Sequence, residues 1–112
     1  MHSEDRVSLL NMIYAAEAVG RFIADRSSTD LEHDQMLLFA VVHAIEVIGE
    51  AAAKVSDEAR ASAPSIPWGS IVAMRNRLAH GYFDIDTDIV WETASVEVPG
   101  LVPSLRALVA GE

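Results

Sequence analysis

Apolar residues recur at helical spacing along the chain, in segments that short polar stretches separate. Over residues 5–26 the pattern predicts a helix with Val7, Leu10, Ile13, Tyr14, Val19 and Phe22 on its buried stripe. A polar stretch follows, and Asp30 is expected to cap a second helix that continues to about Val55. The stripe expected for this second helix contains Met36, Phe39, Ala40, His43, Val47 and Ile48.

Two further helices are predicted before residue 81. Ser56 is expected to cap a short helix over the segment SDEARAS, which Pro64 stops. The next helix opens at Pro67, because proline suits a first helical turn, and runs to about His80. Gly81 then offers a left-handed C-terminal cap.

The last part of the chain predicts a turn and a fifth helix. Residues 84–87 form the turn, and Asp86 or Thr87 caps the helix. Pro99 and Pro103 must end, kink or restart it, since proline lacks the backbone donor. Short connections between amphipathic helices favour an all-α, antiparallel four- to five-helix bundle, with residues 1–112 as a single domain.

Composition narrows the class of protein. The chain has 112 residues, 51% of them hydrophobic, which is enough for one core. There is no cysteine, so disulfides, thiolate metal sites and cysteine nucleophiles are excluded. No secretion leader is recognisable, and no uninterrupted apolar stretch approaches the roughly 20 residues of a membrane span. We therefore expect a soluble cytoplasmic protein without membrane contact.

The net charge of −9 has the wrong sign for a general nucleic-acid binder. If RNA is the substrate, binding must be local, and the densest cluster of basic groups is Arg75, Arg77 and His80. No DNA binding is expected. The acidic surface would suit a basic protein partner or keep the protein in solution.

The fourth predicted helix has two sides of low charge. At about 100° per residue, Ile71, Met74 and Leu78 share one stripe. Asn76 and His80 point roughly to the opposite side, where the residues are small. A helix with little charge on both sides is usually buried on both. We therefore expect the bundle to cover one side and a second subunit to cover the other.

Arg75 and His80 carry the candidate chemistry. Five residues separate them, so on a regular helix they diverge by about 140°, and a twofold axis beside the helix would bring two such pairs into one cleft. Histidine exchanges protons near neutral pH, and arginine holds a phosphate by two parallel hydrogen bonds. Asn76 could orient His80. The pattern suits RNA cleavage without a metal, with the RNA 2′-hydroxyl as nucleophile.

Each of these residues also has a structural interpretation. Arg75 would pair with Glu46 or Glu50 on the second helix whether or not it is catalytic. His80 could be a cation at a helix C-terminus, and Tyr82 a packed aromatic residue with a hydrated hydroxyl. Spacing alone leaves these alternatives open.

The sequence could also indicate a metal site at His33, His43, Glu46 and Glu50, some of which share a helix face. A four-helix di-metal site would need a second E-x-x-H pair, which the chain lacks, so no metal or other cofactor is predicted. His43 lies among apolar neighbours and is expected to be a core or helix-interface histidine. The alternating acids of residues 84–88 lack the glycine and terminal glutamate of a calcium loop.

Two segments of the chain resemble a known family. IEVIGEAA (residues 45–52) and SIPWGSIVAMRNRLAHGYFDIDTDIVW (residues 65–91) closely resemble HepT-like proteins of the HEPN superfamily, and a weaker match covers nearly the whole chain. The resemblance implies a helical bundle that dimerises with its R-x-x-x-x-H motifs facing each other. It also implies toxins that act as metal-independent endoribonucleases.

The resemblance assigns roles to individual residues. Arg75 and His80 match the catalytic arginine and histidine, and Asn76 matches the polar residue after the arginine. Tyr82 matches a tyrosine that, in some members, is adenylylated by the cognate antitoxin, a small MNT-type nucleotidyltransferase. Added AMP would place charge and bulk where RNA phosphate must lie.

Glu50 and Arg77 are candidate supporting residues, and relatives often carry arginine near the position of His43. The first functional hypothesis is therefore the toxin of a type VII toxin–antitoxin system, a ribonuclease that adenylylation of Tyr82 neutralises. The alternative is a non-catalytic helical dimer that binds nucleotides or the nucleotidyltransferase. A third hypothesis is a structural dimer whose motif only stabilises helix packing.

Overall fold

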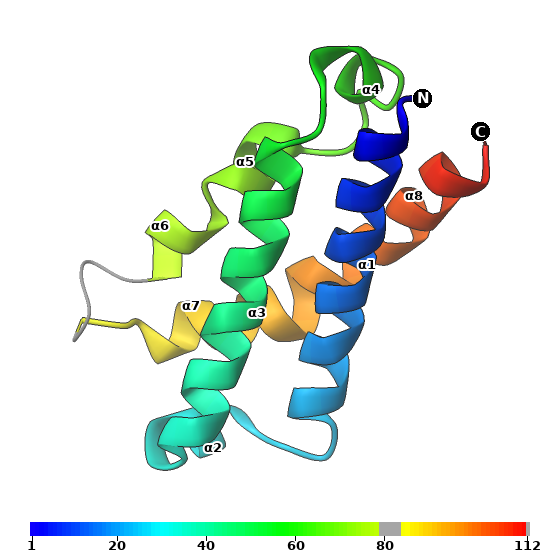
Figure 1. Cartoon of the computed structure of the whole chain (residues 1–112). Coiled ribbons are helices and arrows are strands. Elements are labelled where there is room, and N and C mark those ends of the chain that lie inside the picture. Colours follow the sequence, from blue (N-terminus) through cyan, green and yellow to red (C-terminus); the bar gives the residue numbers. More distant parts are fainter. Residues whose placement is uncertain (79–83, 112) are drawn as a thin grey trace.

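Two long antiparallel helices form the centre of the fold. In the computed structural model, which describes residues 1–78 and 84–111, α1 spans Ser3–Ile23 and α3 spans Gln35–Ala53. They lie side by side and run in opposite directions (Figure 1). All the longer elements described are helices, so the prediction of an all-α fold is confirmed.

The segment between α1 and α3 differs from the prediction. The single helix expected from Asp30 to Val55 is wrong, because a separate helix α2, Ser28–His33, precedes α3. Ser27 is the N-cap of α2, and Asp30, inside the first turn, completes the capping box by accepting a hydrogen bond from the backbone N–H of Ser27 at 2.7 Å. The side chain of Asp34 accepts a hydrogen bond from the backbone N–H of Leu37, 3.1 Å away, and so caps α3. A new cap at this position interrupts the helix.

The buried face of α1 was predicted only in part. Ile13 and Val19 are buried, but Val7, Leu10, Tyr14 and Phe22 are exposed. The helix instead buries a face built around Leu9, Met12, Ile13, Ala15, Ala16, Ala18 and Val19. Because α1 is apolar on more than one side, helical spacing alone does not identify the side that faces the core. The small residues on the buried side let α3 approach closely.

The same correction applies to α3. Ile48 is buried as predicted, whereas Met36 and Phe39 are exposed. His43 is exposed too, so its prediction as a core residue is wrong. The face that packs against the rest of the chain consists of Leu37, Val41, Ala44, Ile45, Ile48, Ala51 and Ala52. A second, partly apolar face of α3 therefore remains uncovered within one chain.

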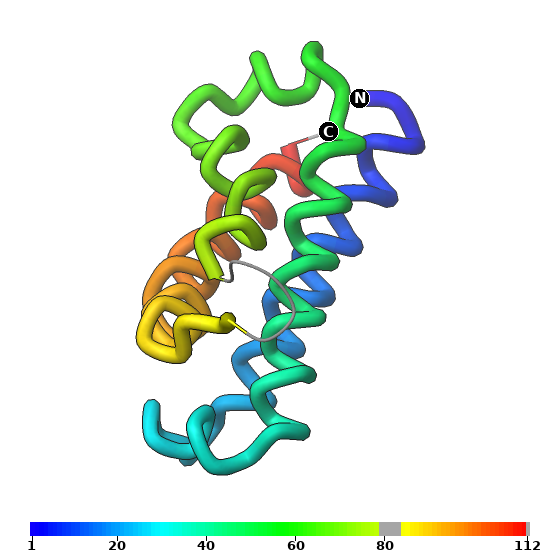
Figure 2. The backbone as a smooth tube through the Cα atoms, turned by 90° about the vertical axis from the view of Figure 1, so that its left-hand side faces the viewer, coloured from blue at the N-terminus to red at the C-terminus, as the bar shows by residue number. Residues whose placement is uncertain are grey.

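The helix after Ser56 forms as predicted. It is α4, Asp57–Ala61, and the Ser56 side chain accepts a hydrogen bond from the backbone N–H of Ala59, 3.2 Å away. The next helix, α5, spans Trp68–Val72, so Pro67 is its N-cap rather than part of its first turn. Figure 2 shows this connection crossing above α3 before the chain turns down beside it.

The predicted fourth helix is divided into two. The α-helix is interrupted at Ala73, which follows α5, and a separate helix, α6, spans Met74–Leu78. At the break, the carbonyl oxygens of Ile71 and Val72 lie 3.3 and 3.5 Å from the position that a β-carbon would take on Gly49 of α3. A glycine there permits this close approach of two backbones. The end of α5 is thereby placed against α3.

The last helical stretch continues through both prolines. It comprises α7 (Thr87–Glu92), a π-helical turn η1 (Thr93–Glu97) and α8 (Val98–Ala110). Asp86 caps α7 as predicted, accepting from the N–H groups of Asp88 and Ile89. The π turn lies directly before Pro99, which stands in the first turn of α8, while Pro103 lies inside that helix. The prediction that both prolines end, kink or restart the helix is therefore supported at Pro99, where the π turn precedes α8, whereas Pro103 lies inside α8 without ending it.

By length and composition alone, α3 also meets the criteria for a membrane-spanning helix. The same test is passed by core helices of soluble proteins, so it carries little weight. In this fold one face of α3 packs against α1 and against α5 to α7. The absence of membrane contact stays a prediction.

Candidate functional site

Arg75 stands on the outside of α6 and reaches toward α3. About 60% of its side chain is exposed, and its Nε lies 3.2 Å from Oε1 of Glu46, whose side chain is 29% exposed. The predicted pairing of Arg75 with Glu46 or Glu50 is therefore confirmed for Glu46. Glu50, one turn further along α3, is exposed. The pair joins the motif helix to the central helix at the surface.

Buried residues of the motif segment hold Arg75 in this place. Ile71, Met74 and Leu78 have at most 2% of their surface exposed, which confirms the stripe predicted for this segment. Burying three such side chains contributes on the order of 1.5–3 kcal/mol each. Together with the close approach at Gly49, they fix the side of α6 that meets the core. Arg75 therefore lies at the edge of this buried side of α6, next to α3.

Arg77 points elsewhere. Its Nη1 lies 3.1 Å from Oε1 of Glu97 in η1, and the hydroxyl of Thr93 donates a hydrogen bond to the other oxygen of that carboxylate. The two arginines of the motif thus contact different elements. Sequence reasoning missed Glu97, because two residues that lie 20 positions apart give no pairing signal.

The remaining motif residues are described only in part. Asn76 and Ala73 are exposed, and the backbone N–H of Asn76 donates to the carbonyl of Ala73 at 3.0 Å. The predictions for His80, Gly81 and Tyr82 fall outside the described residues. The chain on either side of that stretch is joined, because the N–H of Asp86 donates to the carbonyl of Leu78 at 2.8 Å.

An exposed face of α3 lies beside Arg75. It contains Met36, Phe39, His43, Glu46 and Glu50, which repeat at spacings of three and four residues and are called the α3 face below. Met36 is 84% and Phe39 53% exposed. Large apolar side chains clustered on one uncovered helix face are typical of an interaction surface. Glu46 places Arg75 at the rim of that face.

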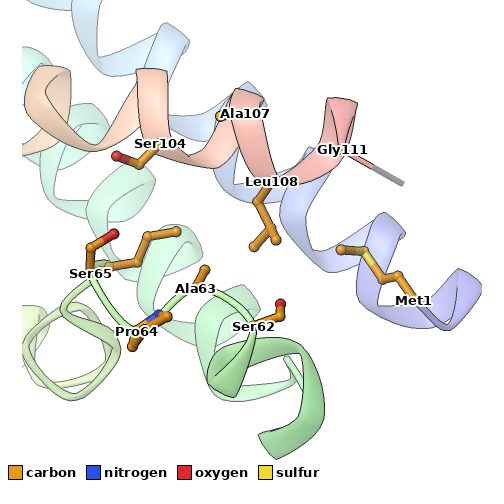
Figure 3. A pocket seen from close by; sticks show the side chains of 10 residues that line it. Met1, Ser62, Ala63, Pro64, Ser65, Ser104, Ala107, Leu108 and Gly111 are labelled. Atoms are coloured by element: carbon orange, nitrogen blue, oxygen red, sulfur yellow. The ribbon is translucent and has the colours of Figure 1, made fainter.

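Two hollows lined by residues that the structure describes lie away from Arg75. One, of about 620 Å³, is bordered by the segment from Ser62 to Ile66 and by the C-terminal part of α8 (Figure 3). Among the described residues that line it, none carries an acidic, basic or histidine side chain. The other, of about 680 Å³, lies between α1 and α8 and contains the ion pair of Glu17 with Arg106. Neither offers the arginine–histidine chemistry that the motif predicts.

No metal-binding group stands out in residues 1–78 and 84–111, where no three His, Asp or Glu side chains gather closely enough to hold an ion. His43 and Glu46 share the α3 face, while His33 lies at the end of α2.

The fold and the site together define an all-α protein that presents a motif arginine beside an uncovered helix face. Residues 12–108 match the model of the HepT-like ribonuclease family. The chain belongs to this family, as the resemblance of its motif predicted.

Individual relatives agree with this assignment. A protein of Methanocaldococcus jannaschii named as an RNase is 33% identical over 91 residues, which cover 81% of this chain and 84% of the relative. A protein of Thermococcus cleftensis named as a ribonuclease HepT is 33% identical over 87 residues, covering 78% and 79%. One from Caldanaerobacter subterraneus, also named as an RNase, is 35% identical over 77% of both chains. No solved structure matches the chain significantly. The family and these names support a ribonuclease of the HEPN type.

Proposed function

We propose that the protein is the toxin of a type VII toxin–antitoxin system and acts in the cytoplasm as a metal-independent endoribonuclease. The observation that carries the proposal is the exposed guanidinium of Arg75 on the motif helix, at the rim of the α3 face, in a chain of the HepT-like ribonuclease family. A cation at the surface is open to an RNA backbone, whereas an arginine buried in a helix interface would not be.

The working form in this proposal is a homodimer joined through the α3 face. Met36 and Phe39 leave an apolar surface uncovered in one chain, and a second copy would cover it with the same surface. A twofold axis there would place Arg75 of both copies beside one shared cleft.

The chemistry assigns one role to each residue. His80 accepts the proton of the RNA 2′-hydroxyl, whose oxygen then attacks the adjacent phosphorus and displaces the 5′-oxygen of the next nucleotide. Arg75 stabilises the negative charge that develops on the phosphate oxygens, and Asn76 orients His80. The products are a 2′,3′-cyclic phosphate and a 5′-hydroxyl; the leaving 5′-oxygen takes its proton from water, and His80 releases the proton it accepted to water, so no net proton is gained or lost.

The same site would be the point of control. The proposed partner is an MNT-type nucleotidyltransferase antitoxin, which transfers AMP from ATP to the hydroxyl of Tyr82 and releases pyrophosphate. An AMP group two residues after His80 adds negative charge that repels the RNA backbone. Glu50 on α3 and Arg77 on α6 are proposed as supporting residues of the site.

The decisive experiment is growth after induction of the chain alone, beside its His80→Ala and Tyr82→Phe variants, with total RNA examined in parallel. We expect growth arrest and RNA cleavage for the wild type and for Tyr82→Phe, and their loss for His80→Ala. Undiminished cleavage by a folded His80→Ala protein would refute the assignment.

The dimer has its own test by light scattering. Phe39→Glu should convert the dimer to monomer, because an unpaired carboxylate in an apolar interface costs several kcal/mol. Val96→Glu is the matched control, since Val96 is 64% exposed, against 53% for Phe39, but lies on η1, outside the α3 face. A monomeric wild type, or a dimeric Phe39→Glu variant, would contradict this arrangement.

Charge favours a second candidate, a non-catalytic dimer that binds nucleotides or the nucleotidyltransferase. The chain carries −9 overall, and the carboxylate of Glu46 partly neutralises Arg75. Tight ATP or partner binding by a purified protein that cleaves no RNA would select this candidate.

A further inference from the structure

The contact between Arg75 and Glu46 bears directly on how the proposed ribonuclease works. Glu46 is less exposed than Arg75 and projects from the middle of α3, the most extensively packed helix of the fold. Arg75 belongs to α6, a five-residue helix that begins where the helical conformation resumes after Ala73. The carboxylate therefore stands on the rigid element and the guanidinium on the short one.

The contact involves the inner nitrogen of the guanidinium. Nε of Arg75 lies 3.2 Å from Oε1 of Glu46, and in the part of the chain that the structure describes no other side chain is paired with this arginine. A guanidinium that contacts Glu46 through Nε leaves the edge formed by Nη1 and Nη2 available, and this edge can bind a phosphate with two parallel hydrogen bonds. Contact with Glu46 and contact with RNA are thus geometrically compatible.

We propose that Glu46 is a positioning residue that orients Arg75 toward the scissile phosphate. This inference rests on the proposed ribonuclease function and names a residue to which neither the family motif nor the sequence assigns a catalytic role. An arginine that is 60% exposed on a short helix samples many rotamers, each with a different direction of its guanidinium. A carboxylate at Nε removes most of these rotamers before RNA arrives.

The opposite possibility is that Glu46 competes with RNA for Arg75 and restrains activity. The two differ in the sign of the mutational effect. If Glu46 positions Arg75, Glu46→Ala lowers the cleavage rate, because a misplaced catalytic group commonly costs 10-fold or more. If Glu46 competes with phosphate, the same variant raises the rate and lowers KM.

The chain supplies a matched control on the same helix. Arg77 and Glu97 form an ion pair of similar length, 3.1 Å, and similar exposure between α6 and η1. Glu97→Ala removes this pair, together with the acceptor of the Thr93 hydroxyl, without touching Arg75. Any loss of activity that comes only from loosening α6 should therefore be at least as large in Glu97→Ala.

The experiment measures kcat and KM for cleavage of a randomised single-stranded RNA oligonucleotide carrying a fluorophore and a quencher. We expect Glu46→Ala to lower kcat by roughly 10-fold or more with KM changed by less than about threefold. Glu46→Gln keeps an acceptor oxygen for Nε and should recover part of kcat. Glu97→Ala should stay within about threefold of wild type.

A double variant tests whether Glu46 acts through Arg75. Arg75→Ala should abolish most of the activity, and adding Glu46→Ala should cause no further loss. Equal kcat in Glu46→Ala and wild type, a raised kcat, or a further loss in the double variant would overturn the inference while leaving the ribonuclease intact. A wild type that cleaves no RNA would overturn the proposed function and this inference with it.

Discussion

The buried carboxylate of Asp5 allows a quantitative test of how the chain is held together. Asp5 is 3% exposed and accepts two hydrogen bonds from Ser56, one from its backbone N–H at 2.8 Å and one from its hydroxyl at 2.6 Å. The same hydroxyl oxygen accepts from the N–H of Ala59 and caps α4. Asp5 therefore joins the start of α1 to the corner between α3 and α4.

Replacing Asp5 by asparagine keeps the shape of the side chain and removes its charge. Asparagine has one acceptor oxygen, so it keeps the bond from the Ser56 N–H only as a neutral bond, about 1 kcal/mol weaker, and its NH₂ group cannot accept from the Ser56 hydroxyl. The two changes together cost about 2 kcal/mol. In a domain of this size that corresponds to a fall of roughly 6–10 °C in Tm. Denaturation should be followed at one fixed protein concentration, because any dimerisation adds to the apparent stability.

Glu4→Gln is the matched control, since Glu4 lies in the same first turn of α1 and is exposed. It removes the same favourable charge from the helix N-terminus, worth about 0.3–1 kcal/mol, without removing a hydrogen bond to Ser56. Asp5→Asn should exceed Glu4→Gln by at least about 1 kcal/mol. Two variants of equal stability would show that the hydrogen bonds contribute no more than the shared helix charge.

The same contact predicts a pH dependence. The hydrogen bond from the Ser56 hydroxyl, and then that from its backbone N–H, hold the pKa of Asp5 below its ordinary value. A lowered folded-state pKa means that this stabilisation is complete above the unfolded-state pKa, about 3.9, and is lost as pH falls through the folded-state value. The stability gap between wild type and Asp5→Asn should therefore be constant near pH 7 and shrink below about pH 4. A gap independent of pH down to 2 would contradict the cause assigned to the pKa shift.

Two further changes test the segment that carries the motif. Gly49→Val should lower the free energy of unfolding by about 1–3 kcal/mol and reduce RNA cleavage, because the valine side chain would press on backbone carbonyls at the end of α5. Calorimetry and a cleavage assay measure the two effects, and a variant as stable and as active as wild type would contradict this reasoning. Asp86→Ala should cost about 1 kcal/mol by removing the cap of α7, and it should speed amide exchange of the Asp86 N–H that bonds Leu78. If the variant is destabilised but the amide exchange rate at position 86 is unchanged, then the cap of α7 does not stabilise the hydrogen bond to Leu78.

Much of the helix content, and the ion pair between Arg75 and the central helix, could be predicted from the sequence pattern. Ser56 and Asp86 cap the helices that follow them, as their side chains and positions indicated. The buried stripe of the motif segment needed only a period of 3.6 residues. Arg75 sits at the edge of that stripe, so its pairing with a carboxylate of the central helix was expected too. Each of these features depends on residues within a few turns of one another or on a charge that requires a partner.

The tertiary structure decided which faces are buried and where helices break. α1 and α3 are apolar on more than one side, so helical period alone could not separate the core side, with Leu9 and Ile45, from the uncovered side, with Tyr14 and Phe39. The division between α5 and α6 depends on how the backbone carbonyls of Ile71 and Val72 pack against Gly49, a residue more than 20 positions away. The pairing of Arg77 with Glu97 likewise follows only once α6 lies beside η1. Local sequence determines whether a segment is helical, whereas burial depends on the shapes of segments distant in the chain, which only packing brings together.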